Sequence, residues 1–434
     1  ILMKKFYYKL FRGSLVLSLF SMSPLTNAQV YVIGNGQMAK AVSDKGKVVV
    51  LNSNIVSYYW TPEEGLQTLD EMPSNVYYIG NPTITADGKT IASTATNKNT
   101  NIVEMATYNL ESKSWNFLGN LGYTLDGVAS SVWGMTPDAN TIVGLANTEN
   151  KGSRGVYWNK EKGLVDIGVT YADRYSRIND VSNDGKIFVG WQDTYDGSRT
   201  GCFWENGKQT LITNPEGLLV NEISKISGDG KWLVGSSGFY ATKWSKETGI
   251  VKIEHPYASS FFYGAATAVN KDGSLIVGYY RGAGPVIYGE GFIWTEKMGL
   301  MTLNAYVKDI LKYDDLGISF ALPLEISEDG KQIVGYGKQG TNNAVSFLIS
   351  LPDSDLSTTN INSTTLEIYP NPTTETINIQ TNGKLTTATL YDMNGKLILN
   401  TSEKSINVKH LPKGIYILRT IIDGKESTKK IIKK

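Results

Sequence analysis

Short apolar runs alternate with turns rich in glycine, aspartate and serine over most of the chain, and the alternation recurs. In the segment Ile226-Ser-Gly-Asp-Gly-Lys-Trp-Leu-Val-Gly235, an apolar residue precedes a Ser-x-Asp-Gly turn, and an apolar run ending in glycine follows it. Seven related copies align on this turn, at residues 42–46, 84–88, 135–139, 181–185, 226–230, 269–273 and 326–330. The chain is therefore an array of units about 40–50 residues long.

Each unit has a second column, an aromatic residue that usually precedes a turn glycine. The column contains Trp60, Tyr108, Trp158, Trp204, Trp244, Trp294 and Phe347. The Asp-Gly pair favours a tight hairpin, because glycine adopts positive φ freely and aspartate bonds its own backbone. With short, β-branched and aromatic runs between the turns, each unit predicts four short strands.

Repeats of four strands at this spacing are typical of propeller blades. The seventh unit supplies three strands between residues 324 and 351, and Val30–Ile33 can supply the fourth. Sharing this blade between the two chain ends would close the ring and leave no free sheet edge. We therefore predict an all-β fold with a seven-bladed β-propeller over residues 29–352. A β-solenoid is the rival fold, although its repeats are usually shorter.

The two ends of the chain differ from the repeats. Residues 1–28 combine four basic side chains, a short apolar core at Ser14–Phe20 and small residues up to Ala28, which predicts a cleaved secretory signal peptide. Residues 353–364 have a linker composition. Residues 365–434 show alternating runs with hairpin signals at Asn394-Gly395 and Asp423-Gly424, and predict a separate small β-sandwich.

This tail resembles the type A sorting domain of the type IX secretion system of Bacteroidota. The resemblance rests on Tyr369-Pro-Asn-Pro372, Leu390-Tyr-Asp-Met-Asn-Gly395, Leu411-Pro-Lys-Gly-Ile-Tyr416 and the basic end Lys429–Lys434. It implies entry into the periplasm, passage through the outer membrane, and removal of the tail by a surface sortase. The secretion machinery and the sortase are then partners. The location would be extracellular or attached to the outer-membrane surface.

The repeats are similar to the extracellular repeats of the HAF family, with the same DG…VG…FW pattern over residues 40–350. This resemblance assigns no chemistry. The Ser-x-Asp-x-Gly-x-Thr-Trp motif of Asp-box sialidases is absent from the sequence, which argues against glycosidase activity by that route.

Composition narrows the candidate chemistry. The sequence has one cysteine, Cys202, and two histidines, His255 and His410, without metal-ligand spacing. We expect no metal and no cofactor, and we place Cys202 in the core. The region between the signal peptide and the tail carries 27 basic and 35 acidic side chains, a net charge near −8, which disfavours nucleic acid as a partner. We expect a monomer without a transmembrane segment in the mature chain.

Strand order places the long, variable connections at one end of the propeller, where binding sites usually lie. The candidate ligand-binding residues in these connections are Arg154, Arg174, Arg177, Arg199, Arg281, Tyr175 and Trp191. Aromatic platforms beside arginine suit sugar rings and acidic groups. The alternative is that these aromatics pack under their own loops and the arginines are only solvated.

Three functions stay open at this point. The first is a secreted or surface-attached binding or adhesion module for a glycan or a protein. The second is an enzyme on extracellular polysaccharide that uses carboxylates from the long loops, such as Asp173, Asp193, Asp196 and Glu290. The third is a purely structural surface protein. The sequence assigns no catalytic residue.

Overall fold

The structure is a computed structural model, and it describes residues 28–53, 55–71, 76, 79–122, 130–148, 152–214, 220–313, 316–352, 366–381, 383–392, 396–422 and 425–434. The chain forms two compact units, Ile1–Leu356 and Ser357–Lys434. The predicted signal peptide, apart from Ala28, and the predicted linker lie outside the described residues, as do both hairpin signals of the tail.

The described strands of the larger unit form seven four-stranded antiparallel sheets. In the first six, four consecutive strands run from the centre outward, and we number these sheets as blades 1 to 6. Blade 1 contains β2 (Met38–Val42), β3 (Val49–Ser53), β4 (Val56–Thr61) and β5 (Gly65–Glu71). Blade 2 contains β6 (Thr83–Ile84), β7 (Thr90–Asn97), β8 (Ile102–Asn109) and β9 (Ser114–Gly119). Blade 3 contains β10 (Ser131–Met135), β11 (Thr141–Thr148), β12 (Gly152–Asn159) and β13 (Gly163–Asp166).

The next three blades repeat this arrangement. Blade 4 contains β14 (Ser176–Val181), β15 (Ile187–Asp193), β16 (Arg199–Glu205) and β17 (Lys208–Leu211). Blade 5 contains β18 (Glu222–Ile226), β19 (Leu233–Ser237), β20 (Tyr240–Ser245) and β21 (Gly249–Ile253). Blade 6 contains β22 (Tyr263–Val269), β23 (Ile276–Arg281), β24 (Glu290–Thr295) and β25 (Gly299–Thr302).

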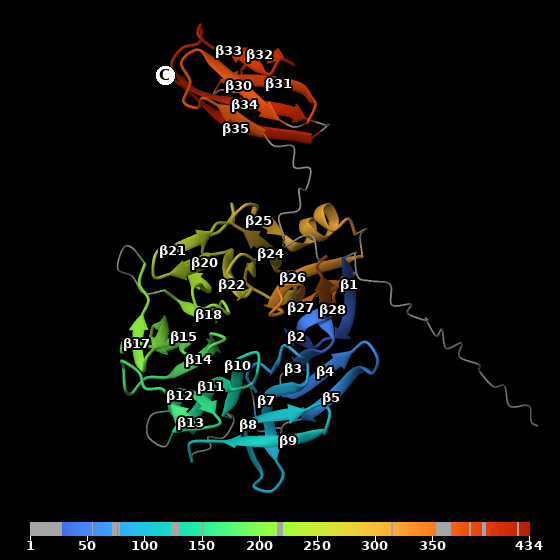
Figure 1. Cartoon of the computed structure of the whole chain (residues 1–434), viewed down its shortest axis with the longest axis vertical. Coiled ribbons are helices and arrows are strands. Elements are labelled where there is room, and N and C mark those ends of the chain that lie inside the picture. The colour runs from blue at the N-terminus through green and yellow to red at the C-terminus, as the bar shows by residue number, and fades with distance from the viewer. Residues whose placement is uncertain are drawn as a thin grey trace, which may run out of the picture. The chain divides into compact units, whose positions relative to one another are not determined.

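Blade 7 joins the two ends of the repeat region. It contains β26 (Ile318–Ile326), β27 (Gln332–Gln339) and β28 (Asn343–Ser350), and its fourth strand is β1 (Gln29–Asn35), which pairs antiparallel with β28. Each inner strand contacts the inner strand of the next blade, and β26 contacts β2. The ring closes as the sequence predicts, and the fold is a β-propeller whose inner strands surround the centre (Figure 1).

The recurring Ser-x-Asp-Gly segment is the turn between the first two strands of a blade. In blade 4 the Ser182 hydroxyl donates to Asp184 Oδ1 at 2.7 Å and accepts the Ile187 N–H at 3.0 Å, while Gly185 has a φ of 71°. The hydrogen bond from Ser182 holds the pKa of Asp184 below its usual value. Equivalent hydroxyl–aspartate bonds form in blades 2, 3, 5 and 7. The motif is therefore structural and needs no ligand to explain it.

Six inner strands carry a β-bulge at the same column. The register shifts around Lys40, Trp133, Asn179, Ser224, Thr267 and Leu324, each two residues before the end of its strand. On the second strand, glycine faces the bulge in five blades. A Cβ on Gly190 would lie 2.0 Å from the Arg177 carbonyl oxygen, and a Cβ on the corresponding glycines 144, 235, 278 and 335 would lie 2.0 to 2.3 Å from inner-strand carbonyl oxygens. The glycine of the repeated Val-Gly pair thus leaves room for the inner-strand carbonyl that the bulge displaces.

Apolar side chains fill the space between neighbouring sheets. One cluster, for example, joins blade 6 to blade 7 through Val277, Ile293, Phe320, Ile333 and Phe347. Cys202 is fully buried, as predicted, and Gln209 Nε2 donates to its sulfur at 3.2 Å. Burial raises the pKa of this thiol, so Cys202 packs as a small apolar residue and is not a nucleophile.

Helical structure in the described residues is limited to short turns. These are η1 (Asp44–Gly46), η2 (Val286–Tyr288), α1 (Leu303–Ala305) and η3 (Tyr306–Ile310). None of these is long or apolar enough to cross a membrane.

The smaller unit is the predicted β-sandwich. One sheet has the order β29 (Leu366–Tyr369), β30 (Thr376–Thr381), β33 (Ser405–Asn407). The other has the order β32 (Leu397–Thr401), β31 (Leu385–Asp392), β34 (Gly414–Ile422), β35 (Lys425–Lys433). Residues from both sheets share one core, including Ile377, Ile406, Leu390, Leu418 and Ile431.

Candidate functional site

A cavity of about 150 Å³ lies at the centre of the ring, and every blade contributes to it. The bulged column supplies one side chain from each of the six bulged inner strands, because each bulge turns that residue toward the axis. The residues that line this central cavity are Lys40, Asn81, Pro82, Thr83, Trp133, Arg177, Asn179, Glu222, Ser224, Lys225, Thr267, Leu324 and Glu325. Arg177 and Glu222 stand near the starts of their strands, so the cavity opens toward the end of the propeller that carries the long connections.

Below the central cavity, a charged cluster crosses the axis. Lys225 Nζ of blade 5 lies 2.6 Å from Glu325 of blade 7 and 3.8 Å from Asp180 of blade 4. A second cavity lies on the Asp-Gly side and shares Thr83, Lys225 and Glu325 with the first. Burial raises the pKa of Asp180 and of Glu325, although the charge of Lys225 opposes the rise. This cluster separates the two cavities and gives the central cavity a floor.

Lys40 is the exception among the charged residues of the cavity. It is partly buried, and it forms no ion pair or hydrogen bond with any residue that the structure describes. Burial lowers the pKa of its ammonium group to about 8, from an ordinary value of 10.5. A desolvated charge without a partner is costly, so Lys40 is a group that a ligand can satisfy.

Two tryptophans and two arginines alternate in a stack that begins in the wall of the cavity, where Trp133 and Arg177 line it. The guanidinium carbon of Arg177 lies 3.3 Å from the ring centroid of Trp133 and 5.1 Å from that of Trp191. The guanidinium carbon of Arg199 lies 3.4 Å from the Trp191 centroid. We name Trp133, Arg177, Trp191 and Arg199 the arginine–tryptophan stack. Contacts this short combine cation–π attraction with planar packing.

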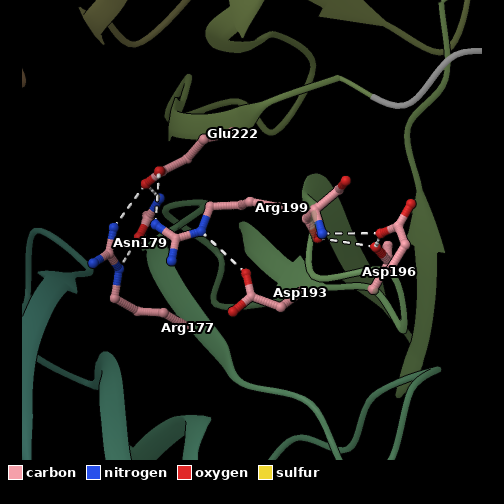
Figure 2. A network of polar contacts seen from close by, with 8 residues as sticks. Arg177, Asn179, Asp193, Asp196, Arg199 and Glu222 are labelled. Carbon is pink, nitrogen blue, oxygen red and sulfur yellow. Dashed lines mark hydrogen bonds and ion pairs between the residues drawn. The ribbon is translucent and has the colours of Figure 1, made fainter.

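Polar partners from blades 4 and 5 fix the stack in place (Figure 2). Glu222 accepts from Arg177 Nη2 at 2.7 Å and lies 3.7 Å from Arg199 Nη1. Asn179 accepts from Arg177 Nε at 2.6 Å and donates to Glu222 at 2.8 Å. Asp193 lies 3.3 Å from Arg199 Nε. With both guanidinium groups held from two sides, the stack is preorganised before any ligand arrives.

The other candidate residues lie apart from the stack. Arg154 is buried, donates to the carbonyls of Ala172 and Arg174, and therefore supports a loop of blade 4 from beneath. Arg174 donates to the Tyr195 carbonyl at 2.7 Å, and Tyr175 in the same loop is 55% exposed. Arg281 belongs to blade 6 and donates to the Gly284 carbonyl at 3.1 Å. The structure thus brings together Arg177, Arg199 and Trp191 and leaves the others elsewhere on the long-loop end. The prediction that the candidates lie in the connections is wrong for five of the seven, because the strands extend further than the apolar runs and include Arg154, Arg177, Trp191, Arg199 and Arg281.

The carboxylates considered for catalysis have different surroundings. Asp193 pairs with Arg199, and Asp196 closes an exposed turn by accepting the Ser198 N–H at 2.9 Å. Glu290 pairs with the ring of His255 at 2.9 Å in blade 6. Among the described residues, no group of three or more His, Cys, Asp or Glu side chains is arranged to hold a metal ion.

The sequence analysis missed Lys40, Trp133, Asn179 and Glu222, and a signal exists for the first three. Each of these stands two residues before the apolar residue that opens the repeated turn. Because the turn motif fixes the alignment of the repeats, a position there that varies from blade to blade marks the wall of the cavity. Glu222 stands outside this position and has no such signal.

The comparisons with known proteins separate the two units. Residues 367–434 match the family described as "Secretion system C-terminal sorting domain". Comparison with curated proteins finds no match. Among solved structures, the chain is similar to one in the "Crystal Structure of Mitotic Checkpoint Complex", with a TM-score of 0.45 and 14% identity over 81% of this chain and 100% of that one. It is also similar to TolB from Acinetobacter baumannii, with a TM-score of 0.39 and 16% identity over 62% of this chain and 64% of that one.

The match to the tail confirms the predicted sorting domain. The sorting domain implies interaction with the type IX secretion machinery and export to the cell surface or the extracellular space. The resemblance of the blades to HAF repeats stays a prediction.

Proposed function

We propose that the propeller is an extracellular binding module, and that a glycan enters the central cavity from the long-loop end. The observation that carries this proposal is the cavity itself, which every blade lines and which contains a charged group that has no partner among the described residues. The indole of Trp133 offers apolar ring surface for the C–H side of a sugar, and hydroxyl and amide groups from four blades also line the cavity. A protein ligand on the same end is the alternative partner.

Binding is favoured over polysaccharide cleavage by the state of the carboxylates. Glycoside hydrolysis needs one carboxyl group as acid and another as base or nucleophile. Glu222 is held by Arg177 and Asn179, and Glu325 by Lys225. Both groups are committed to positioning other side chains, which suits a rigid binding site better than proton transfer.

We also propose how the chain is exported and processed. Residues 1–28 would direct the chain to the periplasm of a member of the Bacteroidota, and the sorting domain would then be removed by a surface sortase. The mature propeller would be a monomer, either released or attached to surface lipopolysaccharide. The arrangement of the blades around a closed ring leaves only short, protected strand edges for a partner chain, which supports the monomer proposal.

A glycan array and a polysaccharide-digestion assay on the full chain test the proposed function. Trp133→Ala removes the indole that lines the cavity. Trp232→Ala is the matched control, because Trp232 lies beside the Asp-Gly turn of blade 5, on the opposite end. We expect a bound glycan without new reducing ends, at least tenfold weaker binding for Trp133→Ala, and normal binding for Trp232→Ala.

Two results would contradict the proposal. Release of oligosaccharides would replace it with the polysaccharide-degrading enzyme. If Trp133→Ala and Trp232→Ala weaken binding equally, or if neither changes it, the ligand binds away from the central cavity.

A further inference from the structure

We infer that the central cavity recognises the single carboxylate of an acidic sugar, a uronate, through the ammonium group of Lys40, with Asn81 accepting a hydrogen bond from a ligand hydroxyl. The inference rests on the proposed function and names the class of glycan. Lys40 differs in this respect from the arginines of the network in Figure 2, since Arg177 and Arg199 already have carboxylate partners.

The charges that face Lys40 come from three other blades. Blade 4 contributes Arg177, blade 5 contributes Glu222 and Lys225, and blade 7 contributes Glu325, while the lining residues of blades 2, 3 and 6 carry no charge. Arg177 is paired with Glu222, and Lys225 with both Glu325 and Asp180. Lys40 is therefore the one cation of the cavity lining that has no carboxylate partner among the described residues. A ligand carboxylate would supply that partner.

The second feature is an acceptor without a donor. Asn81 Oδ1 is buried and has no hydrogen-bond partner among the described residues, and Asn81 lines the same cavity as Lys40. An orphaned buried acceptor is costly, and a hydroxyl or N–H of a ligand would satisfy it. Nearby Ser224, Thr83 and Thr267 add hydroxyl groups to the lining. A ligand with both a carboxylate and neighbouring hydroxyls matches this set, and uronates have that chemistry.

Size and charge restrict the ligand further. A volume of about 150 Å³ is filled by about five water molecules at roughly 30 Å³ each, so the cavity takes one acidic group and the adjoining part of a ring. The acidic body of the propeller opposes the approach of a polyanion, since long-range repulsion acts on every charge of the ligand. An isolated or terminal uronate is therefore favoured over an acidic homopolymer.

Isothermal titration of the full chain with glucuronate, glucose and acetate tests the inference at pH 7 and pH 9. Lys40→Met removes the charge and keeps an unbranched side chain that is one atom shorter. Lys208→Met is the control, because Lys208 is exposed on the outer strand β17. We expect glucuronate to bind at least tenfold more tightly than glucose, to lose at least tenfold in Lys40→Met, and to bind normally to Lys208→Met. Binding should weaken at pH 9, as Lys40 loses its proton.

Each other outcome overturns a different statement. Equal affinity for glucuronate and glucose, unchanged in Lys40→Met but reduced in Trp133→Ala, would overturn the uronate inference and leave the glycan-binding proposal standing. Binding of acetate as tight as that of glucuronate would reduce the site to a carboxylate pocket without sugar recognition. No binding of any saccharide here or on the glycan array would overturn both.

Discussion

Lys40 shows how one residue can oppose the stability of the fold that contains it. The ammonium group of Lys40 has lost part of its hydration and has no carboxylate partner in the described part of the chain, and its lowered pKa expresses this cost. Stable folds usually pair or expose such charges. The side chain is therefore better explained by what it can bind than by what it contributes to folding.

Replacing Lys40 by methionine should stabilise the protein. Folded Lys40 releases its proton near pH 8, whereas the unfolded chain keeps it to about 10.5. Between these values the unfolded chain binds more protons, so this residue makes the free energy of unfolding rise with pH. At pH 7, Lys40→Met should gain about 1–3 kcal/mol. Urea unfolding of both proteins at pH 7 and pH 9.5 should show the difference shrinking at the higher pH; a constant difference would contradict the account.

The sequence predicted part of the site because the arginines and Trp191 stand at strand ends next to the long connections. Arg177, Arg199 and Trp191 do meet in one stack. The sequence could not show that Arg154 bonds inward to carbonyls, since the residue type alone does not tell whether an arginine faces solvent or the backbone of a neighbouring segment. Trp133 and Glu222 were missed because their strands resemble core strands until the bulge is known.

At the scale of the element, the blade combines a tight turn, a bulged inner strand and a glycine opposite the bulge. These parts depend on one another. The bulge aims one side chain at the axis, and the glycine leaves room for the displaced carbonyl. The Val-Gly column was visible in the sequence, and the strands it predicted are present. The reason why glycine recurs in this column is a close contact across the bulge. That contact depends on the register between the strands, so it could not be derived from the pattern alone.

Gly190→Ala tests this dependence. The new Cβ would lie 2.0 Å from the Arg177 carbonyl oxygen, so the inner strand must shift where it carries the stack. We expect a loss of about 2–3 kcal/mol in the free energy of unfolding, as for overpacking of a core. The control is Gly207→Ala, where nothing lies within 4 Å of the new Cβ and only the positive φ of 74° is strained. Equal losses in urea unfolding of the two variants would show that the contact across the bulge has no special weight.

At the scale of the whole molecule, the ring depends on one strand from the N-terminal end. β1 pairs with β28 along six residue pairs and completes blade 7. Without it, the outer edge of β28 is unpaired, while the apolar residues that β1 covers become exposed. Ring closure was predictable because the count of strands in the seventh unit left one missing.

Deleting Gln29–Asn35 should therefore lower the melting temperature of the propeller and promote aggregation. Because β1 contributes to the core around Ile33 and Val30, the loss should exceed that from removing seven residues of the predicted linker, 355–361. Differential scanning calorimetry and light scattering measure both effects. A deletion of β1 that melts like the linker deletion would show that the ring is stable without the shared blade.

The central claim is that the ligand binds on the propeller axis, against Lys40 and Trp133. The most direct measurement is a crystal structure of the full chain with glucuronate. The account predicts a bound sugar in the central cavity, with a carboxylate oxygen within hydrogen-bond distance of Lys40 Nζ and a hydroxyl directed at Asn81 Oδ1. Glucuronate bound only on the outer loops, or a central cavity that stays filled with water at saturating ligand, would contradict it.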